Sequence, residues 1–463
     1  MELIIVEYSF HLYYNNDLSR NISPWLSRFL ILLKGRSFKM VGNVWNIVLL
    51  AFRYIIRFAQ FSLIVVGLYY LIISMFGWVR RKEPNAEDFE PVTKFAMIVA
   101  AHNEECVVGG IVKNLKSLKY PSDKYEIFVI ADNCDDKTAE IARQNGARVF
   151  ERSDSAKKGK GYALEWMFKK LFALNENFDA VCILDADNLV STNFLMEMNK
   201  QLCLGHKVVQ GYLDSKNPHD SWISGNYSLS YWISNRLFQL PRHYLGLSCA
   251  LGGTGFIMST SVLKEIGWGA TCLTEDLEFS IKLALKGMRV AWAHDAHVYD
   301  EKPLKLKQSW KQRTRWMQGH CDCAERFLKS LLVRAFKNKD KVSFDLAVYL
   351  IQPFIIVLNA VFMLAGAIEF LFKPVMVTPF NMPVWLFSII MVVVTYIYIV
   401  FVFIEGKLTL KTALYFILFP IYSLTWVPII IQGYLGRHNR EWVHTVHTRA
   451  MDIGDIEGLE KVG

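Results

Sequence analysis

Hydrophobic residues are distributed unevenly along this chain, and that pattern constrains its fold more than any other feature of the sequence. Hydrophobic residues make up 52% of the 463 positions, a share too high for a wholly water-soluble protein of this length. They concentrate before Val79 and after Phe344, whereas the middle of the chain has an ordinary soluble composition. The sequence therefore predicts one soluble domain held between membrane segments.

The N-terminal part of the chain predicts one membrane helix, over residues 44–78. Ala59 to Trp78 contains no charged residue and is long enough to cross a bilayer as a helix. Residues 1–43 form a tail for which the sequence predicts no definite structure.

The C-terminal membrane region is predicted over residues 345–435. Within it, Tyr349 to Phe372 and Val384 to Ile404 are the expected spans. Leu410 to Leu435 is equally apolar but contains Pro420 and Pro428, which favours a re-entrant or interfacial hairpin.

The charges predict which side of the membrane the soluble domain occupies. The net charge of +9 arises from basic residues that flank the apolar runs, as is typical of cytosolic flanks, and it does not indicate nucleic-acid binding. Arg437, Arg440 and Arg449 follow the last apolar stretch, so we expect the tail over residues 436–463 to be cytosolic. The sequence thus predicts a multi-pass plasma-membrane protein with a cytosolic central domain.

The central domain, residues 90–300, predicts an α/β fold with a mostly parallel sheet. Short apolar strands alternate with amphipathic helices, a pattern typical of parallel sheets covered on both faces. The expected strands are 95–100, 125–131, 148–150 and 180–184, and the expected helices are 105–118, 138–144 and 160–174. In such sheets ligands bind beyond the carboxyl ends of the strands. Residues 301–340, basic and amphipathic, predict interface helices.

The eight cysteines, Cys106 to Cys323, all lie in the soluble stretch, and their spacing indicates reduced thiols in a cytosolic domain. His320-Cys321-Asp322-Cys323 is a possible start of a zinc site. A second ligand pair at finger-like spacing is missing, so we do not predict zinc there.

Two acidic motifs end predicted strands. Asp185-Ala186-Asp187 places two carboxylates at alternate positions where the chain bends, which suits Mg²⁺ or Mn²⁺ bridging to diphosphate oxygens. Asp132 ends the second strand and could accept the imide hydrogen of a uracil ring. The alternatives are a solvated strand end for the first motif and an Asx-type turn before Thr138 for the second.

Two further segments suit a nucleotide. His102-Asn103-Glu104 ends the first strand and could hold a ribose. Lys157 to Gly161 opens a helix, where lysines and glycine amides form an anion site, although a solvated charged loop would look the same.

Thr274-Glu275-Asp276 follows Gly252-Gly253-Thr254-Gly255, whose small residues allow the backbone close to a ligand. A sugar hydroxyl that attacks an anomeric carbon must lose its proton, and a carboxylate is a usual general base. We expect Asp276 to be that base, with Glu275 beside it in the catalytic pair. The alternative is a helix start, with Thr274 as the cap and the acids complementing the dipole.

Gln312-Arg313-Thr314-Arg315-Trp316 lies in the basic amphipathic stretch. Arg315 could neutralise a departing diphosphate, and Trp316 offers a flat apolar face to a pyranose ring. The alternative is a pair of anchors at a membrane interface.

Taken in this order, the motifs resemble those of the membrane-integrated, processive family-2 glycosyltransferases, which include cellulose, hyaluronan and chitin synthases. The resemblance covers roughly Phe95 to Phe336, together with the outline of the flanking spans. It implies a GT-A-type nucleotide-sugar-binding domain that uses Mg²⁺ or Mn²⁺. It also implies that Asp187 binds the metal directly, with Asp185 beside it.

The resemblance implies further roles in donor and acceptor binding. Glu104 and Lys160 would help Asp132 to hold the uridine, and Gln312, Arg315 and Trp316 would close the acceptor end. The tail Glu441 to His447 resembles the Trp-containing gating segment of these synthases, so that Trp442, Thr445 and His447 would cover the nucleotide. The chain departs from the family at Ala131, where a second acid is common.

The expected activity is that of a processive inverting glycosyltransferase, which polymerises a UDP-sugar and extrudes the polymer across the membrane. UDP-glucose is the first expectation, giving a β-glucan with β-1,4 or mixed β-1,3/1,4 linkages. Its partners would be the growing polysaccharide, the lipid bilayer and accessory export proteins. The alternatives are a synthase that uses UDP-N-acetylglucosamine and a non-processive transferase with a lipid acceptor. A transporter with a regulatory nucleotide domain fits less well, because the motif set is catalytic and the spans are few.

Overall fold

The structure is a computed structural model that describes residues 50–51, 54–174, 176–269, 272–372, 385–386, 389–390, 393, 409–439, 449 and 451–456. The chain divides into two compact units, Met1–Ile64 with Thr378–Asn381 and Val65–Val377 with Met382–Gly463. The described residues of the first unit, 50–51 and 54–64, are helical. All elements discussed below, apart from the start of the first membrane helix, belong to the second unit.

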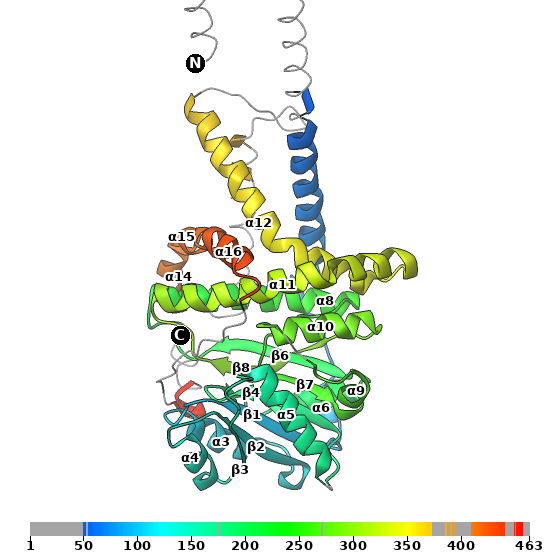
Figure 1. The fold of residues 1–463 in the computed structure, drawn as a ribbon, viewed down its shortest axis with the longest axis vertical. Helices are drawn as coiled ribbons and strands as arrows, with labels where there is room; N and C mark the ends of the chain where they lie inside the picture. Colours follow the sequence, from blue (N-terminus) through cyan, green and yellow to red (C-terminus); the bar gives the residue numbers. More distant parts are fainter. Residues whose placement is uncertain are drawn as a thin grey trace, which may run out of the picture. The chain divides into compact units, whose positions relative to one another are not determined.

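An eight-stranded sheet, in the order β3-β2-β1-β4-β7-β6-β8-β5, forms the centre of the second unit (Figure 1). Its strands are β1 (Phe95–Ala101), β2 (Tyr125–Asp132), β3 (Arg148–Arg152), β4 (Ala180–Asp185), β5 (Leu189–Val190), β6 (Val208–Ser215), β7 (Phe256–Ser259) and β8 (Ala291–Asp300). The predicted strands are therefore confirmed. They pair in parallel, β1 with both β2 and β4, and β2 with β3.

The later half of the sheet differs from the mostly parallel arrangement that we expected. Strand β7 runs antiparallel to both β4 and β6, and β5 runs antiparallel to β8, while β6 and β8 are parallel. The sheet is therefore mixed, because β7 inserts in the reverse direction between the two parallel groups.

Helices cover both faces of the sheet, since successive strand residues are apolar on both sides. In β1, Ala96 and Ile98 belong to one core cluster, whereas Met97 and Val99 belong to the other. The helices of this part are α3 (Val108–Lys116), α4 (Thr138–Gln144), α5 (Lys160–Ala173), α6 (Phe194–Cys203), α7 (Trp222–Ser234), α8 (Leu240–Leu245), α9 (Thr260–Ile266) and α10 (Glu275–Leu285), with a π-helix η4 (Asn235–Gln239) and 3₁₀ turns η2 (Ala86–Asp88) and η3 (Ser122–Lys124).

One helix begins later than the sequence predicted. Helix α3 begins at Val108 rather than at residue 105, because the preceding N–H groups bind the neighbouring loop. The Glu104 N–H donates to Thr138 Oγ1 at 2.8 Å, and the Glu105 N–H donates to Asp136 Oδ2 at 3.1 Å. The loop after β2 thus fixes the loop after β1.

Two described helices are long and apolar enough to cross a membrane, Tyr54–Met75 and Lys341–Ala365, the latter within α12 (Lys341–Phe372). Between the sheet and α12 lies α11 (Leu306–Asn338), a single helix of 33 residues where we expected interface helices. The expected span over residues 384–404 lies almost wholly outside the described residues, as do residues 1–43.

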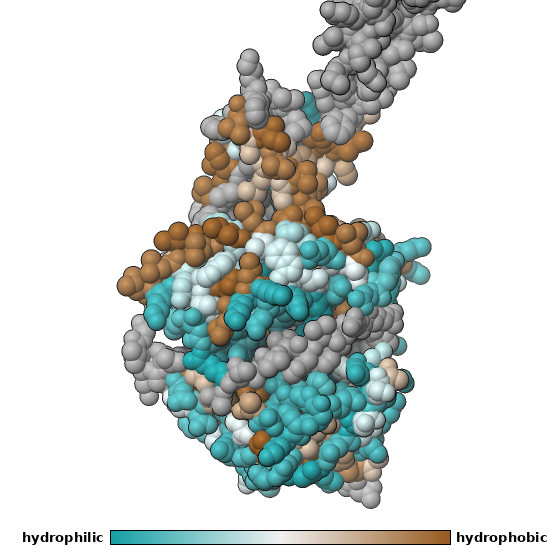
Figure 2. Space-filling model, turned by 60° about the vertical axis from the view of Figure 1, so that its left-hand side comes forward, coloured by the Kyte–Doolittle hydropathy of each residue, from teal (hydrophilic) through white to brown (hydrophobic). Residues whose placement is uncertain are grey.

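The third apolar stretch is broken, as its prolines predicted. It forms α14 (Leu410–Ile417), α15 (Phe419–Leu424) and α16 (Trp426–Leu435), with a bend of 51° after α14. Helix α16 packs directly on α11, since a Cβ placed at Gly433 would lie 2.3 Å from Met317 Cβ. Hydrophobic side chains gather on the outer surface of this hairpin and of α12 (Figure 2). The exposed ones on the hairpin include Leu410, Leu414, Ile417, Ile421 and Leu424.

Candidate active site

The acidic strand-end residues lie at one edge of the sheet. Strand β1 lies between β2 and β4, with Ala101 paired to Ala131 and Ala100 paired to Asp185. Asp132 and Asp185 therefore emerge on either side of β1 at its carboxyl end, where α/β sheets bind ligands.

Asp132 is held by side-chain partners that the sequence did not predict. Its Oδ1 accepts hydrogen bonds from Arg152 Nη1 at 2.5 Å and from Asn133 Nδ2 at 2.9 Å. Burial raises the pKa of Asp132, although the charge of Arg152 opposes that shift. Arg152 ends β3 at the same sheet edge, and sequence reasoning missed it because a single strand-end arginine has no distinctive pattern.

The other residues expected to hold the nucleoside surround Asp132. His102 Nδ1 lies 2.7 Å from the Asp132 main-chain oxygen, and Glu104 is buried beside it at the end of β1. Asn103 and Asn133 both adopt positive φ, at 54° and 53°, so the loops after β1 and β2 turn alike. Asp136 accepts from the Thr138 N–H at 2.9 Å, so the Asx-type turn is present as well.

Lys160 and Asp185 meet where a diphosphate would lie. Lys160, the first residue of α5, forms an ion pair with Asp185 Oδ1 and donates to the Gly253 oxygen at 2.7 Å. Burial works against the Lys160 ammonium, but the charges of Asp185 and Glu275 raise its pKa above the ordinary value. Gly253 has a φ of +80°, which explains the need for glycine in this loop.

Asp187 is buried and held from two sides. Its Oδ2 accepts from the Glu301 N–H at 3.0 Å, and its Oδ1 accepts from Asn188 Nδ2 at 3.2 Å. Among the described residues, no group of three or more His, Cys, Asp or Glu side chains is arranged so that it could hold a metal ion. The two carboxylates nevertheless fit Mg²⁺ or Mn²⁺, which take one or two protein carboxylates when substrate phosphates supply other ligands.

Glu275 and Asp276 open α10 next to the same glycine loop. A Cβ placed at Gly253 would lie 3.4 Å from Asp276 Oδ2, so the carboxylate faces this loop closely. Burial raises the pKa of Asp276 to about 7, and repulsion from Glu275 adds to the shift. Burial likewise raises the pKa of Glu275.

The helix-start alternative is only partly supported. Thr274 occupies the N-cap position, and Glu275, Asp276 and Glu278 lie in the first turn, but the Thr274 side chain makes no capping hydrogen bond. Instead Thr274 packs against α11, where a Cβ at Gly319 would lie 2.4 Å from Thr274 Oγ1. This close approach fixes Glu275 and Asp276 relative to the helix that contains Gln312 and Trp316.

Aromatic rings that the sequence did not predict together pack around Gln312 and Trp316, and two of them, Tyr227 and Tyr422, are buried. Tyr227 of α7 donates its hydroxyl to Gln312 Oε1 at 2.5 Å, and its ring meets Trp316 edge-on at 5.8 Å. Tyr422 of α15 packs against the same Tyr227 at 6.2 Å. The charge of Arg315 acts on Glu275, which places the arginine near the acids.

The remaining residues that the sequence singled out are not part of the site described above. Of these, Trp442, Thr445 and His447 fall outside the described residues, so their predicted role stays a prediction. His320 is buried with Nε2 3.2 Å from the Leu350 oxygen, so it belongs to the packing of α11 on α12. All eight cysteines are free thiols.

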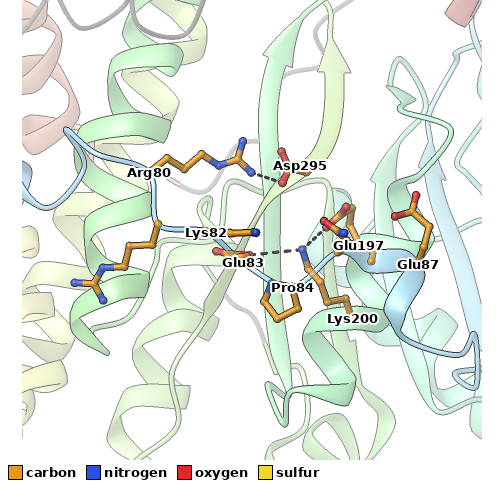
Figure 3. A pocket seen from close by; sticks show the side chains of 11 residues that line it. Arg80, Lys82, Glu83, Pro84, Glu87, Glu197, Lys200 and Asp295 are labelled. Carbon is orange, nitrogen blue, oxygen red and sulfur yellow. Dashed lines mark hydrogen bonds and ion pairs between the residues drawn. The ribbon is translucent and has the colours of Figure 1, made fainter.

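A separate polar hollow of about 380 Å³ lies where the chain passes from the first membrane helix to the sheet (Figure 3). Its charges pair among themselves, Lys200 with Glu197 at 2.6 Å and with Glu83 at 3.6 Å, and Arg80 with Asp295. None of the motif residues lines this hollow, so we place the active site at the strand ends.

The comparisons with known proteins bear on the family and the fold. Residues 91–319 match the family model described as glycosyltransferase like family 2. The chain is 28% identical over 327 residues to the probable glycosyltransferase YdaM of Bacillus subtilis, covering 66% of this chain and 76% of that protein. It is 28% identical over 273 residues to the β-monoglucosyldiacylglycerol synthase of a Nostoc species, covering 55% of this chain and 56% of that protein.

Two further likenesses bear on the acceptor and the fold. A poly-β-1,6-N-acetyl-D-glucosamine synthase of Staphylococcus aureus is 26% identical over 277 residues, covering 57% of this chain and 65% of that protein. The chain thus spans only about half to two thirds of the curated synthases that it matches. A mannosyltransferase of Pyrobaculum calidifontis, solved with GDP-Man and Mn²⁺, has 14% identity and a TM-score of 0.53, covering 82% of this chain and 98% of that one. Residues 91–319 are therefore similar to family-2 glycosyltransferases, the fold is GT-A-like α/β with a mixed sheet, and these likenesses indicate a hexosyltransferase enzyme.

Proposed function

We propose that the protein transfers a hexose from a UDP-sugar to the end of a growing glycan at the membrane surface, with inversion at the anomeric carbon. One observation supports this most strongly. Lys160, Asp185 and the Glu275–Asp276 pair converge on the loop at Gly253, next to α11 and its Gln312 to Trp316 motif. The residues that we propose for binding the diphosphate, for the general base and for binding the acceptor thus lie close to one another.

The reaction would be a single displacement. Asp276 takes the proton from an acceptor hydroxyl as that oxygen bonds to the anomeric carbon, and the bond from this carbon to the diphosphate breaks. Lys160 and Arg315 neutralise the charge that appears on the departing UDP. Asp185 and Asp187 would hold Mg²⁺ or Mn²⁺, which supplies further neutralisation of the diphosphate when bound.

We propose UDP-glucose as the donor and a β-glucan as the product, with extrusion of the polymer across the membrane. The half-buried Trp316, which packs in one cluster with the buried rings of Tyr227 and Tyr422, supports a sugar acceptor, because pyranose rings stack on aromatic faces. A synthase that uses UDP-N-acetylglucosamine is the variant suggested by the Staphylococcus aureus relative.

A lipid acceptor is the second candidate, and a specific observation favours it. Trp316 packs in one cluster with Tyr422 and Phe419 of the α14–α16 hairpin, whose outer surface is apolar. A lipid headgroup could approach the base along this hairpin. The β-monoglucosyldiacylglycerol synthase relative is consistent with that route.

Donor and acceptor can be tested together on purified protein in lipid nanodiscs. The protein is given Mn²⁺ and radiolabelled UDP-glucose or UDP-N-acetylglucosamine, and products are separated into polymer and glycolipid, with Asp276→Asn as the inactive control. We expect polymer from UDP-glucose. Glycolipid alone would establish the second candidate, and consumption of neither donor would refute the proposed function.

A further inference from the structure

The C-terminal residues 449 and 451–456, here called the C-terminal strap, lie against the catalytic domain. Ile456 is only 3% exposed and forms a hydrophobic cluster with Leu189 of β5 and Tyr299 of β8. Met451 and Ile453 pack at the margin of the same cluster. A tail that is free in solvent would leave a large apolar side chain exposed, so this packing indicates a specific binding position for the strap. We call the surface formed by Leu189 and Tyr299 the apolar seat.

The seat adjoins the donor site on both of its strands. Leu189 follows the Asp185 to Asn188 turn directly, and it pairs with Tyr299 in the sheet. Two residues beyond Tyr299 lies Glu301, whose N–H donates to Asp187 Oδ2 at 3.0 Å. The strap therefore rests on the two strands whose ends hold Asp187.

A polar contact joins the strap to the same point. The Arg449 N–H donates to Glu301 Oε2 at 3.2 Å, and its guanidinium pairs with Asp220. Glu301 thus accepts from the strap through its side chain and donates to Asp187 through its main chain. Glu301 alone therefore connects the C-terminal strap to the Asp187 carboxylate in these two contacts.

The charges near Glu301 suggest how the strap could affect the position of Asp187. Asp187, Asp300 and Glu301 crowd together where β8 ends, and their charges all act on the buried Lys216. Lys302 pairs with Asp300 at 2.6 Å, and Arg449 is the cation that the strap adds. Like charges in a poorly solvated place repel unless cations are fixed among them.

We propose that the C-terminal strap is a positioning element of the donor site. Seated on Leu189 and Tyr299, it holds Glu301, which in turn fixes the Asp187 carboxylate for a metal-bound diphosphate. Ile456 and Glu301 are then positioning residues rather than catalytic ones. This inference rests on the proposed function, because it assumes that Asp187 serves a nucleotide donor.

The test uses full-length protein in nanodiscs and measures UDP affinity by calorimetry with Mn²⁺ and with EDTA. Ile456→Asp should release the strap, because a carboxylate cannot remain in the apolar seat. Gly454→Ala is the matched control, since a Cβ at this position meets no atom within 4 Å. Hydrogen exchange of the amides of residues 451–456 reports whether the strap is seated.

We expect Ile456→Asp to speed exchange in the strap and to weaken UDP binding at least tenfold with Mn²⁺, leaving binding in EDTA unchanged. Gly454→Ala should match the wild type in both. Glu301→Ala should weaken UDP binding with Mn²⁺ in the same way, although the strap remains partly bound to its apolar seat. Glu301→Gln keeps an acceptor for the Arg449 N–H, so it should bind UDP as the wild type does.

Three results would count against the inference. Fast exchange in Ile456→Asp with wild-type UDP affinity would show that the strap does not position Asp187. Unchanged exchange in that variant would show that the apolar seat does not hold the segment. Failure of the wild type itself to bind UDP with Mn²⁺ would instead refute the proposed function, and the inference with it.

Discussion

Replacing Asp276 by asparagine tests the proposed base most directly. The substitution preserves shape and keeps an oxygen for the Leu277 N–H, which donates to Asp276 Oδ1 at 2.7 Å. It removes only the proton-accepting charge. Loss of a general base typically lowers the rate by about 10²–10⁴-fold, or about 3–5 kcal/mol in the barrier. UDP affinity should barely change, because the asparagine adds no repulsion toward a diphosphate.

The pH dependence gives a second, independent test of the same residue. With the pKa of Asp276 raised to about 7, kcat/KM should rise as pH increases through about 7 and then level off. Because Glu275 contributes to that shift, Glu275→Gln should move the rising limb to lower pH.

Stability distinguishes this role from that of a helix-start acid. A carboxyl group whose pKa is raised by folding stabilises the folded state fully below its ordinary pKa, and this contribution is lost as pH rises through about 7. Asp276→Asn should therefore not lower Tm at pH 8. A helix-dipole role predicts a loss of about 0.3–1 kcal/mol instead.

The control lies in the same turn of α10. Glu278 pairs with Arg326 at 2.9 Å, so Glu278→Gln should lower Tm while sparing the chemical step. Glycan formation, UDP affinity and Tm are measured on one preparation of each variant. A folded Asp276→Asn enzyme with a near wild-type rate would refute the assignment.

Three further predictions concern the donor, the acceptor and the topology. Asp187→Asn should abolish turnover and weaken UDP binding only when metal is present, and equal affinity of variant and wild type with Mg²⁺ would contradict this. Trp316→Ala should shorten the product or raise the acceptor requirement, since stacking on an aromatic face contributes on the order of 1 kcal/mol; a fall in UDP affinity by calorimetry would contradict an acceptor role. A reporter fused after Gly463 that is active only outside the cell should stay silent, and strong activity would mean that residues 410–435 cross the membrane.

The parts of the fold that could be predicted are those with a local signature. The strand that ends at Asp185 is an apolar run followed by two acids, so the strand and its carboxyl end could be predicted from the sequence. The same holds for β2, which ends at Asp132. The late start of α3 could not be predicted from the sequence. It depends on hydrogen bonds from the Glu104 and Glu105 N–H groups to Thr138 and Asp136, which lie in another part of the chain.

The missed site residues share one physical cause. Arg152 reaches Asp132 only because β3 pairs with β2, and Tyr227 reaches Gln312 only because α7 packs near α11. Glu301 meets Asp187 through its main chain, which leaves no trace in side-chain chemistry. Such contacts arise from the tertiary fold, so periodicity and motif spacing could not predict them. The reversed strand β7 is similar, since its four residues reveal no direction.

The ends of the α14–α16 hairpin bear on whether it crosses the membrane. A crossing segment must begin and end on opposite sides of the bilayer. Here Thr409 Oγ1 lies 3.5 Å from His219 Nδ1, and the Tyr415 hydroxyl donates to the His219 oxygen at 3.3 Å. After the hairpin, Arg449 pairs with Asp220, the next residue of the catalytic domain. Thr409 before the hairpin and Arg449 after it therefore contact the same short segment of the catalytic domain.

The inner face of the hairpin is also held on the domain side. Arg313 of α11 is fully buried, with its guanidinium 4.4 Å from the Tyr422 ring and 4.9 Å from the Trp426 ring, and it donates to Thr425 Oγ1 at 2.9 Å. A buried cation held by two rings resists removal into lipid, because the charge would lose these contacts. The exposed side chains of the hairpin are mostly apolar, such as Leu414 and Ile421. A segment with one face fixed to the domain and the other mostly apolar suits an interfacial position, so we expect the reporter fused after Gly463 to stay silent.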